Sequence, residues 1–187
     1  MRCAPLLLAV LTVLAACAPS FDGEPLGHRA APAFTLTDQR GLPWSLSAQH
    51  GKVVALYFGY THCPDDCPLT LAKLSRAIAT LGPHSHAEIA FVTVDPQRDT
   101  PSVLRAFISH FHGATIAGLT GSRASLARVY RAYDIWSQAL AQRKRGGYEV
   151  AHATPVYLID RNGMLRVLHD DSDTVAAFEH DLAALGA

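Results

Sequence analysis

A strand that ends at two closely spaced cysteines is the feature that most limits how this chain can fold. Residues 52–60 form a nearly continuous run of apolar, β-branched and aromatic residues, which is typical of a strand buried on both faces. Cys63 and Cys67 follow directly, and residues 68–81 then carry leucine and isoleucine at helical spacing. The two cysteines therefore lie in the turn that joins a central strand to a helix.

Strands and helices alternate along the rest of the chain. Residues 34–37 and 43–46 flank a polar turn and predict an N-terminal β-hairpin. Further strands are predicted at 89–94, 115–119, 154–160 and 164–168, and further helices at 101–111, 122–133 and 174–185. The alternation indicates a single α/β domain with a mainly parallel sheet, to which the last two strands add an antiparallel pair.

A cysteine turn that follows the first central strand and opens a helix matches the thioredoxin-like plan. In that plan the loop before the late hairpin packs against the cysteine turn. This loop corresponds to residues 150–155, and it contains His152. The predicted fold class is therefore a thioredoxin-like α/β fold, a central mixed sheet flanked by helices with an N-terminal β-hairpin extension. In this fold His152 lies near the thiols of Cys63 and Cys67.

The N-terminus predicts export. Arg2 precedes an apolar core at residues 6–14 that is too short to span a bilayer comfortably, and small residues then lead to Cys17. This pattern resembles a bacterial lipoprotein signal, in which cleavage leaves the cysteine as an acylated N-terminal residue; the alternative is an ordinary secretory signal with an incidental cysteine. We expect a signal peptide at 1–17 ending at lipidated Cys17, a flexible tether at 18–29 and a folded domain at 30–187. The expected location is the periplasmic side of a bacterial membrane.

Only two of the four cysteines remain in the expected domain, because Cys3 leaves with the signal and Cys17 carries lipid. Neighbouring thiols form a disulfide in an oxidising compartment unless they are reduced or occupied. A disulfide closing so small a loop restricts the unfolded chain little and adds little stability, so a chemical role is expected. The formal net charge is zero and no basic patch is interleaved with aromatic residues, so nucleic-acid binding has no support.

The position of the cysteines at a helix N-terminus favours the thiolate form, because free N–H groups and the helix dipole stabilise negative charge. A thiolate both attacks disulfides and binds metal ions, so the pair predicts either a redox centre or a metal site. Two thiolates and one imidazole form a soft, three-coordinate set that suits copper in either oxidation state. A closed zinc site would need a fourth ligand, and the sequence offers no obvious candidate.

Three motifs together closely resemble the Sco/SenC family. They are residues 58–68 (FGYTHCPDDCP), residues 91–100 (FVTVDPQRDT), and His152 ahead of residues 156–160 (VYLID). Members of this family are membrane-tethered copper proteins of thioredoxin fold that are implicated in assembling the dinuclear CuA centre of cytochrome c oxidase. The resemblance covers nearly the whole expected domain.

The resemblance implies a ligand set and a role. Cys63 and Cys67 match the family's thiolate ligands, His152 matches its imidazole ligand, and Asp95 matches an aspartate placed close to the metal loop. The implied function is that of a membrane-tethered copper chaperone that binds Cu(I) or Cu(II) and helps to assemble the CuA centre of cytochrome c oxidase subunit II. The implied partners are this subunit, a periplasmic copper donor, a thiol reductant and, through the lipid anchor, the membrane.

Two residues depart from the family pattern. Pro155 follows shortly after the histidine, and a cis Thr154–Pro155 bond would favour mixed-disulfide chemistry. Asp66 stands where an apolar residue is commoner and adds negative charge close to a bound cation. The alternative function is therefore a thiol:disulfide oxidoreductase with Cys63 as the attacking thiolate and Cys67 as the resolving thiol. A thiol peroxidase has less support. A peroxidatic cysteine usually needs an arginine and a threonine close by to activate peroxide, and Thr61 is the only obvious local candidate.

Overall fold

The computed structural model describes residues 20–140 and 147–187 and contains one large sheet. Its strands are β1 Glu24–Ala30, β4 Val53–Gly59, β5 Ala87–Thr93, β6 Thr115–Leu119, β9 Val156–Ile159 and β10 Met164–His169. They lie in the order β1-β10-β9-β4-β5-β6. β4 pairs parallel with β5 and β5 with β6, whereas the other three pairs are antiparallel. The predicted mixed sheet is confirmed.

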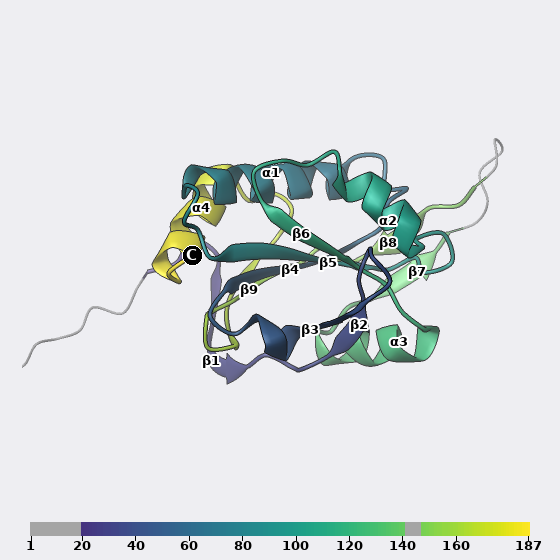
Figure 1. Cartoon of the computed structure of the whole chain (residues 1–187), viewed down its shortest axis with the longest axis horizontal. Helices are drawn as coiled ribbons and strands as arrows, with labels where there is room; N and C mark the ends of the chain where they lie inside the picture. Colours follow the sequence, from purple (N-terminus) through teal and green to yellow (C-terminus); the bar gives the residue numbers. More distant parts are fainter. Residues whose placement is uncertain (1–19, 141–146) are drawn as a thin grey trace, which may run out of the picture.

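Helices cover both faces of this sheet. Their bounds are α1 Asp66–Thr80, α2 Pro101–Ile108, α3 Arg123–Ala132 and α4 Val175–Ala184. In Figure 1, α1, α2 and α4 lie on one side of the sheet and α3 lies on the other. Three of the helices follow a hydroxyl residue whose side chain accepts a backbone N–H, namely Thr100, Ser122 and Thr174. These N-caps fix where the helices begin.

The predicted N-terminal hairpin is also confirmed. It consists of β2 Thr35–Thr37 and β3 Pro43–Ser45, and the short 3-10 helix η1 Leu46–Gln49 follows it. The Asp38 carboxylate forms the turn by accepting the backbone N–H of Arg40 at 2.8 Å and of Leu42 at 2.9 Å.

The expected tether is shorter than residues 18–29. Residues 24–30 form β1, which lines the edge of the sheet by pairing with β10. Ahead of it, the Asp181 carboxylate accepts the backbone N–H groups of Asp22 at 2.9 Å and of Gly23 at 2.9 Å. The sequence of β1 is polar and mostly exposed and it contains proline and glycine, so it carries no apolar alternation that would predict a strand. The signal peptide and Cys17 lie outside the described residues.

A second small hairpin was also missed. β7 Ser137–Ala139 pairs antiparallel with β8 Val150–His152, so His152 lies at the end of a strand and not in a simple loop over 150–155. Three-residue strands are too short to show a period in the sequence. The basic residues 143–145 lie outside the described residues.

The two aromatic residues at the end of β4 point to opposite faces, as neighbouring strand residues do. Phe58 contacts Tyr133 and Tyr157, with ring centroids 5.8 and 6.5 Å apart. Tyr57 contacts Phe91 on the other face, at 5.9 Å. The strand is buried along its whole length, so the loop that follows it is anchored in the core.

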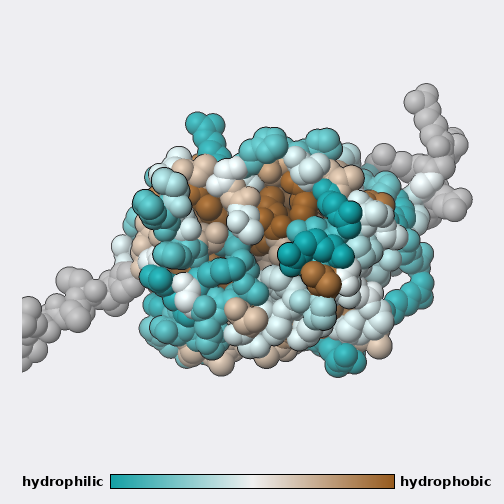
Figure 2. Space-filling model, in the orientation of Figure 1, coloured by the Kyte–Doolittle hydropathy of each residue, from teal (hydrophilic) through white to brown (hydrophobic). Residues whose placement is uncertain are grey.

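The surface drawn in Figure 2 is mostly hydrophilic, with a small group of hydrophobic residues near its centre, over the region of β6 in Figure 1. Among the described residues no helix combines the length and apolar character needed to cross a membrane.

Candidate metal centre

The cysteine loop begins where β4 ends, and its first constraint is a glycine. A Cβ atom added to Gly59 would lie 2.8 Å from the Cys67 Sγ and 2.7 Å from the Phe91 ring. Both distances are shorter than van der Waals contact allows, so only glycine lets the strand pass beneath the thiol. Cys67, in the first turn of α1, is thereby packed directly against the sheet and fully buried.

Asp99 holds the loop in place from below. Its buried carboxylate accepts the Thr61 hydroxyl at 2.6 Å, the Thr61 backbone N–H at 3.1 Å and the Thr93 hydroxyl at 2.6 Å. Burial raises the pKa of the Asp99 carboxyl, and these three hydrogen bonds oppose the rise. The sequence predicts at most that Asp99 pairs with Arg98, but Arg98 pairs with Asp95 and Asp99 instead holds the cysteine loop.

His152 reaches Cys67 from β8. Its Nε2 lies 3.7 Å from the Cys67 Sγ, and its Nδ1 lies 2.7 Å from the Ala153 carbonyl oxygen. Because a carbonyl oxygen only accepts, Nδ1 carries the proton and the Nε2 lone pair faces the sulfur. This second hydrogen bond is the one that metal-binding histidines ordinarily make to fix the tautomer.

The two cysteines are free thiols of different character. Cys63 is half-buried, and a hydrogen bond from the Cys67 thiol lowers its pKa to about 4, with further help from the backbone N–H of Cys67. The Cys67 N–H lies 3.4 Å from the Cys63 Sγ. The same thiol–thiol contact and complete burial raise the pKa of Cys67. At neutral pH one negative charge is therefore concentrated on the more accessible sulfur.

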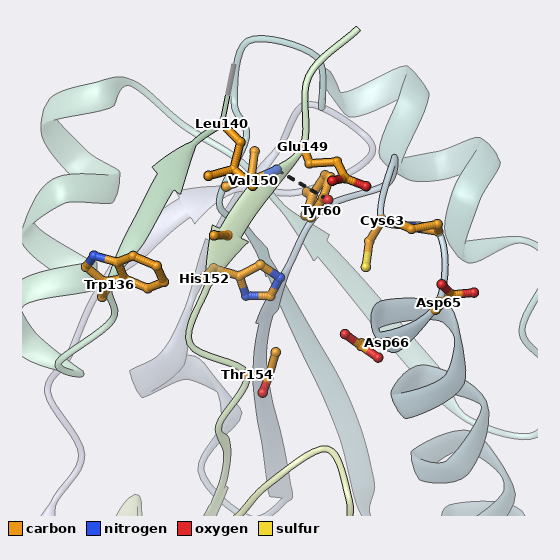
Figure 3. A pocket seen from close by; sticks show the side chains of 12 residues that line it. Tyr60, Cys63, Asp65, Asp66, Trp136, Leu140, Glu149, Val150, His152 and Thr154 are labelled. Carbon is orange, nitrogen blue, oxygen red and sulfur yellow. Dashed lines mark hydrogen bonds between the residues drawn. The ribbon is translucent and has the colours of Figure 1, made fainter. Parts of the chain in front are cut away.

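A pocket of about 320 Å³ opens over these groups. Figure 3 shows Cys63, on the loop into α1, and His152, on β8, on opposite walls of this pocket, with Asp66 beside them. Trp136 and Leu140 line its outer part and leave 55% and 44% of their surface exposed. Burial and the charge of Cys63 raise the pKa of Asp66, which is consistent with its position near the thiolate.

Asp95 does not line this pocket. Its carboxylate forms an ion pair with Arg98 and accepts the Tyr148 hydroxyl at 2.7 Å. The Arg98 guanidinium lies 5.7 Å from the centre of the Tyr60 ring, and this ring meets His152 edge-on at 5.7 Å. Asp95 is thus connected to the imidazole through two intervening side chains.

Two neighbours of the site, Pro155 and His62, are also described by the structure. All peptide bonds between described residues are trans, so the Thr154–Pro155 bond is not cis. His62, next to Cys63, directs Nδ1 to the Thr61 hydroxyl at 3.0 Å and does not line the pocket.

A second group of possible ligands lies elsewhere in the described part of the chain. Donor atoms of Asp22, His180 and Asp181 all lie within 4.8 Å of one another, which is a tighter grouping than that of Cys63, Cys67 and His152. The Asp181 carboxylate is already engaged by backbone N–H groups and by His169, whose Nε2 lies 3.0 Å away. This cluster therefore has a structural explanation as an anchor for the start of β1.

The fold and the site together define a thioredoxin-like protein with a dithiol and an imidazole at the head of its first main helix. The chain belongs to the SCO1/SenC family, whose model matches residues 23–186. The thioredoxin-like fold predicted from the sequence is thereby confirmed.

Individual relatives agree with this placement. The yeast (Saccharomyces cerevisiae) mitochondrial protein SCO2 is 40% identical over 133 residues, which cover 70% of this chain and 44% of that protein. A putative copper-binding protein from Stutzerimonas stutzeri is 35% identical over 141 residues, covering 74% of this chain and 68% of that one. The match thus spans about half of the mitochondrial relatives, 44% of the yeast protein and 50% of a Bos taurus SCO2 homolog.

Solved structures give the same result. The copper-bound ScoI of Bradyrhizobium japonicum superposes with a TM-score of 0.74 at 32% identity, covering 82% of this chain and 98% of that one. The apo Sco1 protein of Thermus thermophilus superposes with a TM-score of 0.79 at 32% identity, covering 91% and 99%.

Proposed function

We propose that this protein is a copper chaperone that carries one copper ion on Cys63, Cys67 and His152. The observation that carries the proposal is the approach of the His152 Nε2 lone pair to the Cys67 sulfur, across a pocket that also contains the Cys63 thiolate. Relatives described as copper-binding support the same cargo.

The donor set suits both oxidation states of copper. Thiolate sulfur is the ligand that Cu(I) prefers, and imidazole extends the set to Cu(II). Binding releases the proton of Cys67 to solvent, because only the thiolate coordinates the ion. Cys63 contributes its negative charge without that cost, since its pKa is already low.

The receiving centre in this proposal is the CuA site of cytochrome c oxidase subunit II, reached by ligand exchange. The exposed side chains of Trp136 and Leu140 beside the pocket offer an apolar contact for such a partner. A periplasmic copper donor and a thiol reductant would supply the ion and keep the dithiol open.

The proposal places the domain on the periplasmic side of a bacterial membrane. Its signal peptide ends at Cys17, which is retained as the lipidated anchor, and residues 18–21 are the remaining tether before the segment held by Asp181. A relative from Bacillus anthracis is described as a SCO1/SenC family lipoprotein, which supports this arrangement.

The test is a titration of the full chain, purified in detergent, reduced and anaerobic, with Cu(I) against a competing chelator. We expect one-to-one binding that is lost in Cys63→Ser and weakened at least about tenfold, or about 1.4 kcal/mol, in His152→Ala. His62→Ala is the matched control, because this imidazole is adjacent to Cys63 but does not line the pocket. Binding that is indifferent to His152 would contradict the chaperone proposal.

The difference between the two thiols favours a second function, thiol:disulfide exchange. A half-exposed thiolate at Cys63 and a buried thiol at Cys67 are the arrangement of an attacking and a resolving cysteine. Such an activity would need both cysteines and would survive His152→Ala. Reduction of a disulfide in the apo subunit II domain by wild type and His152→Ala at equal rates would establish it.

A further inference from the structure

Two buried hydroxyl groups lie behind the Cys67 sulfur. Tyr57 is two residues before Gly59 on β4 and shares its face of the strand, and Thr70 is one helical turn after Cys67 on α1. Both side chains are fully buried. Gly59 lies directly beneath the Cys67 sulfur, so Tyr57 and Thr70 flank that sulfur from the strand and from the helix, and burial together with Cys67 raises the pKa of the Tyr57 hydroxyl. Neither hydroxyl, however, makes a hydrogen bond of normal geometry within the described residues.

Tyr57 differs in this respect from the other tyrosines of the chain. The hydroxyls of Tyr130, Tyr133 and Tyr157 donate to backbone carbonyls at 2.6, 2.8 and 2.7 Å. The Tyr148 hydroxyl donates to Asp95, and the Tyr60 hydroxyl accepts from the Val150 N–H at 3.4 Å. A buried polar group without a partner is costly and rare, so the Tyr57 hydroxyl calls for an explanation.

The nature of the nearby sulfur supplies this explanation. A neutral thiol is a weak acceptor, whereas a metal-bound thiolate carries negative charge and accepts strongly. Tyr57 lies on the face of β4 against which the Cys67 sulfur packs at Gly59, and both side chains are fully buried, so water does not serve either group. We propose, resting on the copper-carrying function above, that Tyr57 is a positioning residue that donates its hydroxyl hydrogen to the Cys67 sulfur when this sulfur binds copper, while the Thr70 hydroxyl donates to the Tyr57 oxygen from behind.

The protons balance in this arrangement. As the sulfur–copper bond forms, the Cys67 thiol proton leaves to solvent and Tyr57 keeps its own proton as the donor. Hydrogen bonds to a metal-bound cysteine sulfur change its electron donation and hence the affinity and spectrum of the centre. The copper-bound state therefore gives the Tyr57 hydroxyl a hydrogen-bond acceptor that the metal-free state does not provide.

The experiment compares wild type, Tyr57→Phe and Tyr133→Phe as full chains in detergent. Tyr133→Phe is the matched control, because it removes a buried hydroxyl whose hydrogen bond to the Pro32 carbonyl lies away from the thiols. We measure Cu(I) affinity by chelator competition, the melting temperature of the metal-free reduced protein, and the ultraviolet thiolate-to-copper band as a difference between loaded and metal-free protein. Thr70→Val is a second variant at the same hydroxyl cluster.

We expect Tyr57→Phe to weaken Cu(I) binding about tenfold and to shift the thiolate-to-copper band, while the metal-free melting temperature stays equal to wild type or rises. Thr70→Val should weaken binding by a smaller factor. Tyr133→Phe should lower the melting temperature and leave affinity and spectrum unchanged. Equal copper affinity and an unshifted band in wild type and Tyr57→Phe would overturn the role of Tyr57 and leave the proposed copper-carrying function unaffected. Failure of wild type to bind copper through Cys63 would instead overturn the function on which the inference rests.

Discussion

His152 Nε2 lies 3.7 Å from the Cys67 Sγ, although the two residues are 85 positions apart in the chain. The contact depends on β8, which holds His152 opposite Ser137, and on α1, whose first turn is packed onto the sheet at Gly59. The site is therefore assembled by the fold and not by a local motif.

Gly59→Ala should disturb Cys67 without touching any ligand. The added methyl group would lie within contact distance of both Cys67 Sγ and the Phe91 ring, so the strand or the helix must shift. We expect a loss of about 1–3 kcal/mol in unfolding free energy and a weaker copper affinity. Denaturant unfolding and chelator competition measure the two effects. Gly118→Ala on β6 is the control: it should cost some stability and leave copper binding unchanged.

Asp99→Asn should loosen the cysteine loop. The carboxylate now accepts hydrogen bonds from Thr61 and Thr93. The asparagine amide would replace one of its acceptor oxygens by an NH₂ donor and leave buried donors without an acceptor. Thermal unfolding should show a loss of about 1–3 kcal/mol, and copper affinity should fall with it. Glu24→Gln, which removes an exposed carboxylate on β1 that does not line the pocket, should change neither. An Asp99→Asn protein as stable as wild type would show that the loop is held by other contacts.

The reactivity of Cys63 should be almost independent of pH above about pH 6. Its pKa is lowered to about 4, so the thiolate is fully formed at neutral pH and is protonated as the pH falls through the pKa. Iodoacetamide labelling of the reduced protein, followed by mass spectrometry, should give a rate that falls towards about pH 4, and Cys67 should stay unlabelled because it is buried. A rate that instead rises steadily through pH 8 would contradict the lowered pKa of Cys63.

Trp136→Ala should separate copper binding from copper transfer in the proposed function. The side chain is exposed at the edge of the pocket and is not placed to bind the ion, so the affinity for Cu(I) should equal that of wild type. Transfer of copper to the purified subunit II domain should slow by about tenfold, because one apolar contact of the encounter complex is lost. Leu42→Ala, which removes an equally exposed side chain from the turn between β2 and β3, should leave the transfer rate unchanged.

The central strands and the main helices could be predicted because their sequences are strongly patterned. β4 and β5 are buried at every position, so β4 appears as an uninterrupted apolar run and β5 as an apolar run interrupted by Glu88 alone before it ends at Thr93. β1 could not be predicted, since an exposed edge strand needs no apolar face, and β7 and β8 are too short to show a period.

The parts of the candidate site differ in the same way. Cys63 and Cys67 are conspicuous in the sequence, and His152 follows once the fold places its segment beside them. Tyr57 and Asp99 could not be recognised, because a tyrosine inside an apolar strand resembles any core residue, and an aspartate in a loop resembles any solvated one. Their partners become apparent only when β4, β5 and α1 are assembled.

The edge position of β1 also affects how the chain associates with itself. Without residues 24–29, the hydrogen-bonding edge of β10, with buried Leu165 and Val167 along it, would be open to pairing with another chain. β1 covers that edge with a strand that contains Pro25, Gly27 and Arg29, residues that discourage further pairing. A protein shortened to begin at residue 30 would therefore dimerise through its sheets or aggregate, even with its metal ligands intact.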